Sequence, residues 1–395
     1  MAYVPNLRFN FEDDYTTYQL HQFASRVTRK NKNNESLLPL TISAQYGLVD
    51  QISFFNKSVA SSDLSNYYLL QNGEFAYNKS YSNDYPWGAI KRLDRYDKGC
   101  LSTLYICFKP NESLVDTDYL VHYFESPKWY KQVSDIAGEG ARNHGLLNIA
   151  VRDFFLTKHK FPSLEEQGKV ADLLNKIQER IEAQNKIIED LKLLKDSIID
   201  YLYNHNGGLE YKFKDLYTKA KEGGTPSTTV TSYYKNGQIP FIKIDDLNSK
   251  YIIHNQTYIT NEGMKNSSAW LIPINSVILS NGATIGVTSI NTYPVTTKQG
   301  ILGIIPSKLV NYEYLYYLLN TSVFKKNLKK ITTKGTMECA YIKDIDNIIL
   351  RVPTLDVQLK SVKILNSLDK RLAIENNMIN EYKDQKIYLL RNLFI

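Results

Sequence analysis

Two stretches of the sequence decide the fold, because they repeat one pattern. Residues 161–204 read "FPSLEEQGKVADLLNKIQERIEAQNKIIEDLKLLKDSIIDYLYN", and residues 352–394 read "VPTLDVQLKSVKILNSLDKRLAIENNMINEYKDQKIYLLRNLF". An offset of 191 residues aligns the two stretches and pairs Gln167 with Gln358. A repeat of this length indicates that the chain uses one structural plan twice.

Each repeated stretch predicts one long helix. Mostly apolar residues recur at alternating steps of four and three, which is the period of about 3.5 residues expected of a coiled-coil seam. The predicted seam comprises Leu174, Ile177, Ile181, Gln184, Ile188, Leu191 and Ile198 in the first stretch and Leu365, Leu368, Leu372, Glu375, Ile379, Tyr382 and Leu389 in the second. Polar seam members such as Gln184 and Glu375 typically fix the register of two helices.

The ends of the first helix are marked by its sequence. Ser163 and Glu166 have the spacing of a capping box directly after Pro162, and Gly207 with Gly208 predicts where the helix stops. About 40 helical residues span roughly 60 Å, so such a helix cannot bury its apolar stripe alone.

Two packing arrangements would bury these stripes. Each helix could pack only against its own globular segment, or the two helices could pair with each other. We favour an antiparallel pair, because the helices match in length and pattern and the second globular segment starts directly after the first helix.

The segments outside the long helices mix short apolar runs with short helical patterns. "LSTLYICF" from Leu101 and "SVILSN" from Ser276 are typical of strands, and Asn-Gly turns separate such runs. "YQLHQFA" from Tyr18 also matches "YKFKDLY" from Tyr211. The prediction is an α+β fold with two tandem globular domains and two spacer helices, and its segments are residues 1–160, 161–208, 209–352 and 353–395.

Composition limits the class of protein. The chain has 395 residues, 43% of them hydrophobic and 23% charged, which suits several globular domains. No apolar run approaches the roughly 18 residues of a membrane span, and no secretory signal is visible, so we expect a cytoplasmic protein. Three cysteines and six histidines without paired spacing predict neither a disulfide framework nor a metal site.

Charge and motifs narrow the function. The net charge is +7, and residues 209–352 contain 17 basic and 10 acidic residues, which favours a polyanionic partner for that segment. The sequence contains no "GKS", "GKT" or "PP", so it lacks both a nucleotide-binding phosphate loop and the Asn-Pro-Pro-aromatic motif of amino methyltransferases. We therefore expect no catalytic activity in this chain.

Several stretches together resemble a known family. They are "VPNLRFNF" from Val4, "GEFAYNKSYSNDYPWGAIKRL" from Gly73, "KGCLSTLYICF" from Lys98, "GGTPS" from Gly223, "GQIPFIKIDDL" from Gly237, "ILSNGATIG" from Ile278 and the two long repeats. In this order they resemble the specificity subunit of type I restriction-modification systems. The two-fold order of globular half and spacer helix is the most specific part of the likeness.

The resemblance implies a DNA-reading subunit. Each half would recognise one part of a split site in double-stranded DNA, the helices would set the gap, and two DNA adenine methyltransferase subunits would bind alongside. Restriction or translocase subunits join some complexes of this family. No cofactor is expected in this chain, whereas S-adenosylmethionine, ATP and Mg would be bound by the partner subunits.

DNA reading needs cations for phosphates and polar side chains for base edges, on loops that can reach a groove. The candidates in the first half are Arg29, Lys30, Lys32, Asn78, Lys79, Ser80, Lys91, Arg92, Arg142 and Asn143. Those in the second half are Thr225, Ser227, Lys243, Ser280, Asn281, Lys298, Gln299 and Lys334. The alternative function is a coiled-coil scaffold with two protein-binding domains and no DNA binding.

Overall fold

The structure is a computed structural model that describes residues 5–43, 45–56, 63–82, 85–138, 145–282, 284–333 and 338–395. It divides into two compact units. Unit 1 comprises Met1–Asn185 with Asn377–Ile395, and unit 2 comprises Lys186–Asn376. The long helices α6 (Leu164–His205) and α11 (Leu355–Asn392) each contribute one part to each unit. The units therefore divide within the helices, whereas the sequence placed each helix in a segment of its own.

Unit 1 is a mixed unit of short strands and helices before α6. Its elements are β1 (Thr16–Gln19), α1 (Leu20–Phe23), β2 (Ala24–Arg26), the 3₁₀ helix η1 (Lys32–Asn34), β3 (Leu40–Ser43), β4 (Gly47–Asp50), α2 (Gln51–Phe55), β5 (Tyr68–Gln71), β6 (Phe75–Asn78), β7 (Ala89–Arg92), β8 (Lys98–Leu101), β9 (Ile106–Pro110), α3 (Thr117–Glu125), η2 (Pro127–Trp129), α4 (Tyr130–Ser134), α5 (Val151–Phe155) and β10 (Lys158–Phe161). The sheets are β2-β9-β6-β7, β3-β4, β5-β8 and β1-β10.

The central sheet of unit 1 is buried on both faces. Alternate residues of a strand point to opposite sides, and β6 follows this rule. Phe75 and Tyr77 pack into the core that contains α3 and the long helices, whereas Ala76 joins a second core on the other face. Strand β9 repeats the pattern with Phe108 and Cys107.

Unit 2 has the same kind of architecture. Its elements are β11 (Leu209–Lys212), η3 (Phe213–Leu216), β12 (Tyr217–Glu222), η4 (Thr231–Tyr233), β13 (Ile239–Ile242), η5 (Ile244–Asp246), β14 (Tyr251–Ile252), β15 (Tyr258–Ile259), α7 (Asn261–Lys265), β16 (Val277–Ser280), β17 (Thr288–Asn291), β18 (Thr296–Thr297), β19 (Ile301–Pro306), α8 (Tyr312–Leu318), α9 (Ser322–Ile331), α10 (Ile342–Ile345) and β20 (Ile349–Val352). The sheets are β12-β19-β16-β17-β14, β15-β13-β18 and β11-β20.

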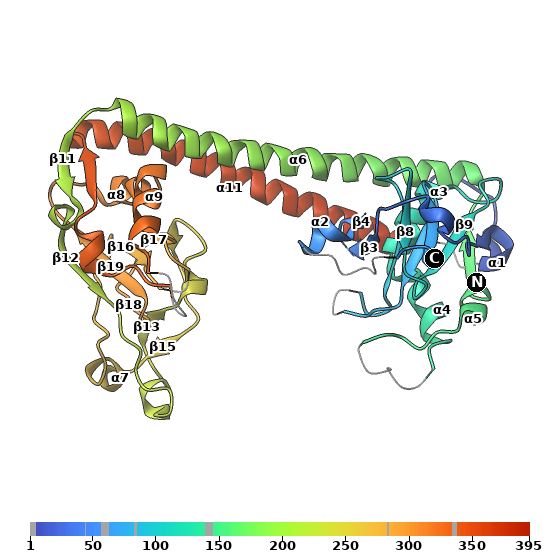
Figure 1. The fold of residues 1–395 in the computed structure, drawn as a ribbon, viewed down its shortest axis with the longest axis horizontal. Helices are drawn as coiled ribbons and strands as arrows, with labels where there is room; N and C mark the ends of the chain where they lie inside the picture. The colour runs from blue at the N-terminus through green and yellow to red at the C-terminus, as the bar shows by residue number, and fades with distance from the viewer. Residues whose placement is uncertain are drawn as a thin grey trace. The chain divides into compact units, whose positions relative to one another are not determined.

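Strand β16 divides the apolar side chains of unit 2 between two cores. Val277 and Leu279 pack towards α8 and α9, and Ile278 packs on the other face. Figure 1 shows α8 and α9 between this sheet and the unit 2 parts of the long helices. The predicted mixture of helices and strands is confirmed.

One glutamine in each unit ties the start of a long helix to the start of an earlier helix in the same unit. The side-chain oxygen of Gln167 accepts a hydrogen bond from the N–H of Asp116 at 2.8 Å, and its amide donates to the carbonyl five residues earlier at 2.9 Å. Gln358 makes the corresponding bonds, with Asn311 and with the carbonyl five residues earlier, both at 2.8 Å. Asp116 and Asn311 are the N-caps of α3 and α8.

A strand pair in each unit follows the same register. Tyr18 in β1 lies opposite His159 in β10, and Tyr211 in β11 lies opposite Leu350 in β20. Both pairs are antiparallel, and the second strand of each pair directly precedes a long helix. The repeat in the sequence therefore corresponds to equivalent hydrogen-bonded pairs inside each unit.

The long helices pack on each other within each unit. In unit 2, Lys195 Nζ lies 2.5 Å from Asp369 Oδ1, and the Asn206 amide donates to the Ser361 hydroxyl at 2.9 Å. Later positions on α6 thus meet earlier positions on α11, so these parts run antiparallel. In unit 1, Lys386 Nζ donates to Gln178 Oε1 at 2.9 Å. All fourteen predicted seam residues are buried or half-buried.

The two ends of α6 differ in how well the sequence described them. The predicted stop is confirmed, since α6 ends at His205 and Gly207 follows with a φ of +64°. The predicted capping box is wrong. The Glu166 carboxylate pairs with Arg8 at 2.8 Å, and the Ser163 hydroxyl is buried without a hydrogen bond among the described residues.

Candidate nucleic-acid interface

The "GGTPS" motif of unit 2 forms a loop whose two glycines lie against the backbone of other segments of the unit. The Gly223 and Gly224 N–H groups donate to the carbonyls of Ile301 and Thr297 at 2.9 Å and 3.1 Å. A Cβ on Gly224 would lie 2.5 Å from the backbone nitrogen of Ala269, so this approach requires glycine. The loop then carries Thr225 and Ser227 outward, and both are exposed.

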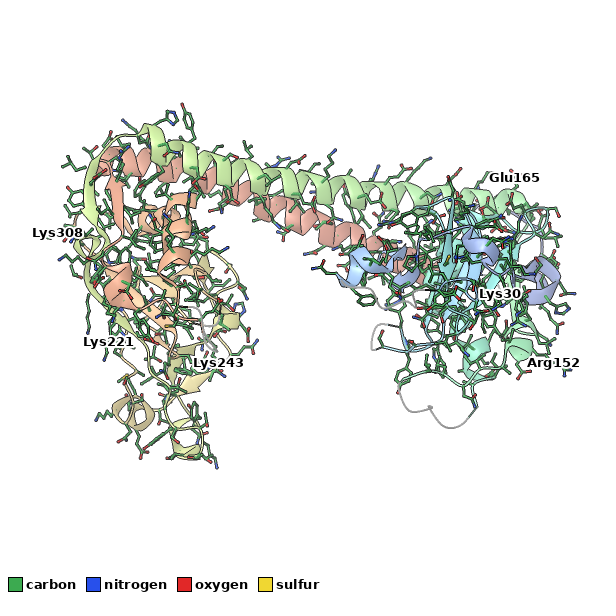
Figure 2. The ribbon with its side chains drawn as sticks, viewed as in Figure 1. Lys30, Arg152, Glu165, Lys221, Lys243 and Lys308 are labelled. Atoms are coloured by element: carbon green, nitrogen blue, oxygen red, sulfur yellow. The ribbon has the colours of Figure 1, made fainter. Side chains whose placement is uncertain are left out.

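A second loop of unit 2 is held beside this motif. The N–H of Lys298 donates to the carbonyl of Ile242 at 3.0 Å, and the N–H of Gln299 donates to the Thr225 hydroxyl at 3.4 Å. Lys243 directly follows Ile242 and is exposed, as are Lys298 and Gln299. We call Thr225, Ser227, Lys243, Lys298 and Gln299 the loop cluster. Figure 2 shows Lys243 in the part of unit 2 away from the long helices.

Ser280 and Asn281 require a correction. Each is 1% exposed, which leaves no side chain for a base or a phosphate. The Ser280 hydroxyl donates to the carbonyl of Thr284 and accepts from the N–H of Val287, and the Asn281 amide donates to the carbonyl of Ala340 at 3.1 Å. These residues shape the turn after β16 from inside the unit.

In unit 1 the structure brings residues 78–80 next to residues 145–147. The N–H of Leu147 donates to the carbonyl of Lys79 at 2.9 Å, and Ser80 forms an isolated bridge with Leu146. Ser80 is exposed, whereas Asn78 and Lys79 are half-buried. The predicted Arg142, Asn143 and Lys334 lie outside the described residues.

The first basic run of unit 1 has several partners within the protein. Arg29 pairs with the buried carboxylate of Glu74 at 2.7 Å. Lys30 Nζ donates to the carbonyl of Asn66 at 2.7 Å. Lys32 is exposed on η1. Arg29 and Lys30 therefore each have a polar partner within unit 1.

Lys91 also requires a correction. It is 9% exposed, and its Nζ lies 2.7 Å from Glu125 Oε1. Lys386 from α11 reaches the other oxygen of the same carboxylate at 2.9 Å. Burial disfavours the charged form of Glu125, but Lys91 and Lys386 outweigh it and lower the pKa of this carboxyl to about 2. Lys91 therefore holds the end of α3 against the sheet and the long helix.

Arg92 has a similar structural role. Its guanidinium pairs with Asp118 at 2.7 Å and with Asp94 at 2.6 Å. Unit 2 has the corresponding contact, because Lys250 pairs with Glu313 at 2.9 Å. Asp118 and Glu313 each lie in the first turn of the helix that packs on the sheet. Arg92 thus has partners within unit 1, and its role as a DNA contact stays a prediction. The sequence could not show the pairing of Arg92 with Asp118, because these two residues lie far apart in the chain.

The second globular half matches a known family. Residues 209–383 fit the family model of the type I restriction modification DNA specificity domain. Through this segment the chain is similar to that family, and the matched residues make up less than half of the chain. The resemblance that the sequence predicted is thereby confirmed, and the loop cluster lies within the matched specificity domain.

Two curated relatives match part of the chain. The type I restriction enzyme MjaIX specificity subunit of Methanocaldococcus jannaschii is 30% identical over 187 residues, which cover 47% of this chain and 43% of the relative. The EcoR124I/EcoR124II specificity subunit of Escherichia coli is 28% identical over 169 residues, which cover 41% of each. These matches thus span about two-fifths of the relatives' own length.

The fold comparison extends over the whole chain. A structure solved to explain complex assembly and conformational transition of the type I R-M system covers 98% of this chain and 99% of its own, with a TM-score of 0.63 and 16% identity. At this identity the likeness shows the fold alone.

The described residues contain neither a cluster of metal ligands nor a membrane-spanning helix. No three His, Cys, Asp or Glu side chains there come together as metal ligands would. None of the described helices is long and apolar enough to cross a membrane.

Proposed function

We propose that the chain is a non-catalytic specificity subunit that reads a bipartite site in double-stranded DNA. The observation that carries this proposal is the equivalence of Gln167 and Gln358. The second half matches the specificity-domain model, and unit 1 repeats the framework that joins that domain to its long helix. Two frameworks of this kind support two reading domains, each for one part of the split site.

The proposed architecture is a tandem repeat of target-recognition domains joined by an antiparallel coiled coil. The buried seam residues and the Lys195–Asp369 contact within unit 2 support the coiled coil. Because α6 is continuous from one unit to the other, its length would set the gap between the two parts of the DNA site. No residue of this chain is assigned a chemical step.

Partner subunits would supply the chemistry. We propose that two DNA adenine methyltransferase subunits dock on the long helices and bring S-adenosylmethionine, and that restriction or translocase subunits, where present, bring ATP and Mg. An exposed apolar stripe on α6 supports docking. Ile187, Leu194 and Tyr201 follow each other at steps of seven and are 43%, 47% and 60% exposed. Residues seven apart share one face of a helix, so they can meet a partner together.

DNA binding by the assembled complex tests this proposal against the scaffold alternative. The chain would be purified with its methyltransferase, and binding to a duplex with the split motif would be compared with binding to a scrambled duplex at about 150 mM salt. We expect binding at least about a thousand-fold tighter to the split motif. Equal binding to both duplexes would leave the scaffold as the better account. Leu194→Glu should weaken capture of the methyltransferase, whereas Lys192→Glu on another face of α6 should not.

A further inference from the structure

Helix α9 of unit 2 carries an unusual concentration of positive charge. Its ten residues read "SVFKKNLKKI", with four lysines and no acidic residue. These lysines supply four of the 17 basic residues between positions 209 and 352. The corresponding segment of unit 1, which follows α3, has only Lys128 and Lys131 in "PKWYKQVS". The positive excess of the second half is thus concentrated on one element.

The apolar face of α9 fixes the orientation of its lysines. Phe324 and Leu328 are 0% and 2% exposed in the core of unit 2, and their spacing of four residues places them on one face. The lysines on the other faces are all exposed. Within the part of the chain that the structure describes, none of the four forms an ion pair. Such an uncompensated cluster costs helix stability, since like charges at this spacing repel.

Two of these lysines line a hollow in the surface. Lys325 and Lys329 border a hollow of about 420 Å³ together with Leu328, Thr332, Glu338 and the backbone around Gly286. Gly286 has a φ of +92°, which favours glycine, and its N–H donates to the carbonyl of Ser280 at 2.9 Å. The loop that forms one wall is therefore held in place from inside the unit.

Hydrogen bonds join the turn after β16 to the backbone next to the loop cluster. The N–H groups of Asn281 and Gly282 both donate to the carbonyl of Gly300, at 2.9 Å and 3.1 Å. Gly300 directly follows Gln299 of the loop cluster, and Ile285 and Gly286 line the hollow at the other end of the loop. The backbone next to the loop cluster thus has hydrogen-bonded neighbours close in sequence to residues that line the hollow.

We propose that Lys325 and Lys329 bind a phosphodiester of the DNA backbone in this hollow. The inference rests on the proposed function. It adds a contact to the DNA backbone, called the anchor, that does not depend on the base sequence. Lysine binds phosphate as a point charge, and release of counterions from the DNA would drive the contact. The Glu338 carboxylate lines the same hollow and repels the phosphate. The anchor belongs to unit 2, which accounts for the uneven charge of the two halves.

The test uses the full chain in complex with its methyltransferase. Binding to a duplex with the split motif and to a scrambled duplex would be measured from about 50 to 300 mM salt. Lys325→Gln with Lys329→Gln should weaken binding to both duplexes by about ten-fold and lower the slope of log affinity against log salt by about one to two. Glu338→Gln should strengthen binding to both.

The matched control is Lys214→Gln with Lys308→Gln, which removes the same charge from exposed positions of unit 2. Figure 2 shows Lys308 on the opposite side of this unit from Lys243. The control should change affinity less than three-fold. Unchanged affinity and salt slope in the α9 variant would overturn the anchor, and so would a changed base preference. Failure of the unaltered complex to prefer the split motif would instead overturn the proposed function.

Discussion

Gln167 shows how a single side chain joins a long helix to the domain before it. Both of its hydrogen bonds go to backbone groups, at 2.8 Å and 2.9 Å, and the residue is 1% exposed. Gln358 is 0% exposed and forms the same bonds in unit 2. Without the side chain, a part-buried N–H and a buried carbonyl lose their partners, which costs about 1–3 kcal/mol for the buried group and less for the other.

Removal of either glutamine should therefore destabilise the unit that contains it. We expect Gln167→Ala or Gln358→Ala to lower the free energy of unfolding of that unit by about 2–4 kcal/mol. Calorimetric unfolding of each variant measures the effect. Gln385→Ala on the exposed surface of α11 is the control and should change the melting temperature little. Equal melting of all three variants would contradict this role.

The carboxylate of Glu125 predicts a pH dependence. Burial opposes its charge, but Lys91 and Lys386 lower its pKa from 4.5 to about 2. A carboxyl with a lowered pKa in the folded state contributes stability above its ordinary pKa and loses that contribution as the pH falls towards the folded value. The contribution is therefore present at pH 7 and declines from about pH 4.5 towards pH 2.

Glu125→Gln should thus melt at a lower temperature than the unaltered chain at pH 7. The difference between the two melting temperatures should shrink at pH 3.5, because the unaltered chain loses part of the ionic contribution there. Melting curves at the two pH values measure this. Glu112→Gln, at an exposed position, is the control. A difference that stays constant or grows on acidification would argue against the ionic role of Glu125.

Individual residues also show which contacts the sequence could predict and which it could not. The repeat singled out Gln167 and Gln358 as matched positions, although it could not reveal their bonds. The sequence misplaced Lys91 and Glu166, because an isolated cation suggests a phosphate contact and a helix-start carboxylate suggests a cap. Their actual partners, Glu125 and Arg8, are distant in the chain and are brought close only by folding.

At the scale of elements, the long helices were the most predictable part of the fold. Their seams depend on local periodicity, which a sequence displays directly. The short strands were less predictable, because β14 and β18 contain two residues each and depend on neighbours such as β17 and β13. All five residues of the loop cluster were candidates from the sequence, whereas the burial of Ser280 and Asn281 follows from contacts across the unit.

Lys195 on α6 tests the pairing of the helices within unit 2. Lys195→Asp would place a second carboxylate next to Asp369, where Lys195 Nζ now lies 2.5 Å away. We expect a loss of about 2 kcal/mol in the free energy of unfolding, and at least half of it should return on addition of Asp369→Lys. Lys192→Asp, at an exposed position on the same helix, is the control. No recovery in the double variant would contradict direct pairing.

At the scale of the whole molecule, the continuity of α6 and α11 makes their length a testable quantity. One heptad inserted after Gln184 and another after Glu375 would keep both seams in register and lengthen each helix by about 10 Å. We expect the gap in the methylated motif to grow by about three base pairs, at about 3.4 Å for each pair. Either insertion alone should destabilise the chain. An unchanged gap in the motif of the doubly extended chain would show that the helices do not set it.

The methylome of a host that expresses this chain with its methyltransferase tests the central claim most directly. It would be compared with the methylome of a host in which residues 17–160 are replaced by the corresponding segment of a relative. If each unit reads its own part of the site, the unaltered chain should give a split motif, and the replacement should change one half while the other half and its orientation persist. A continuous motif, or a change on both sides of the gap, would contradict two independent reading units.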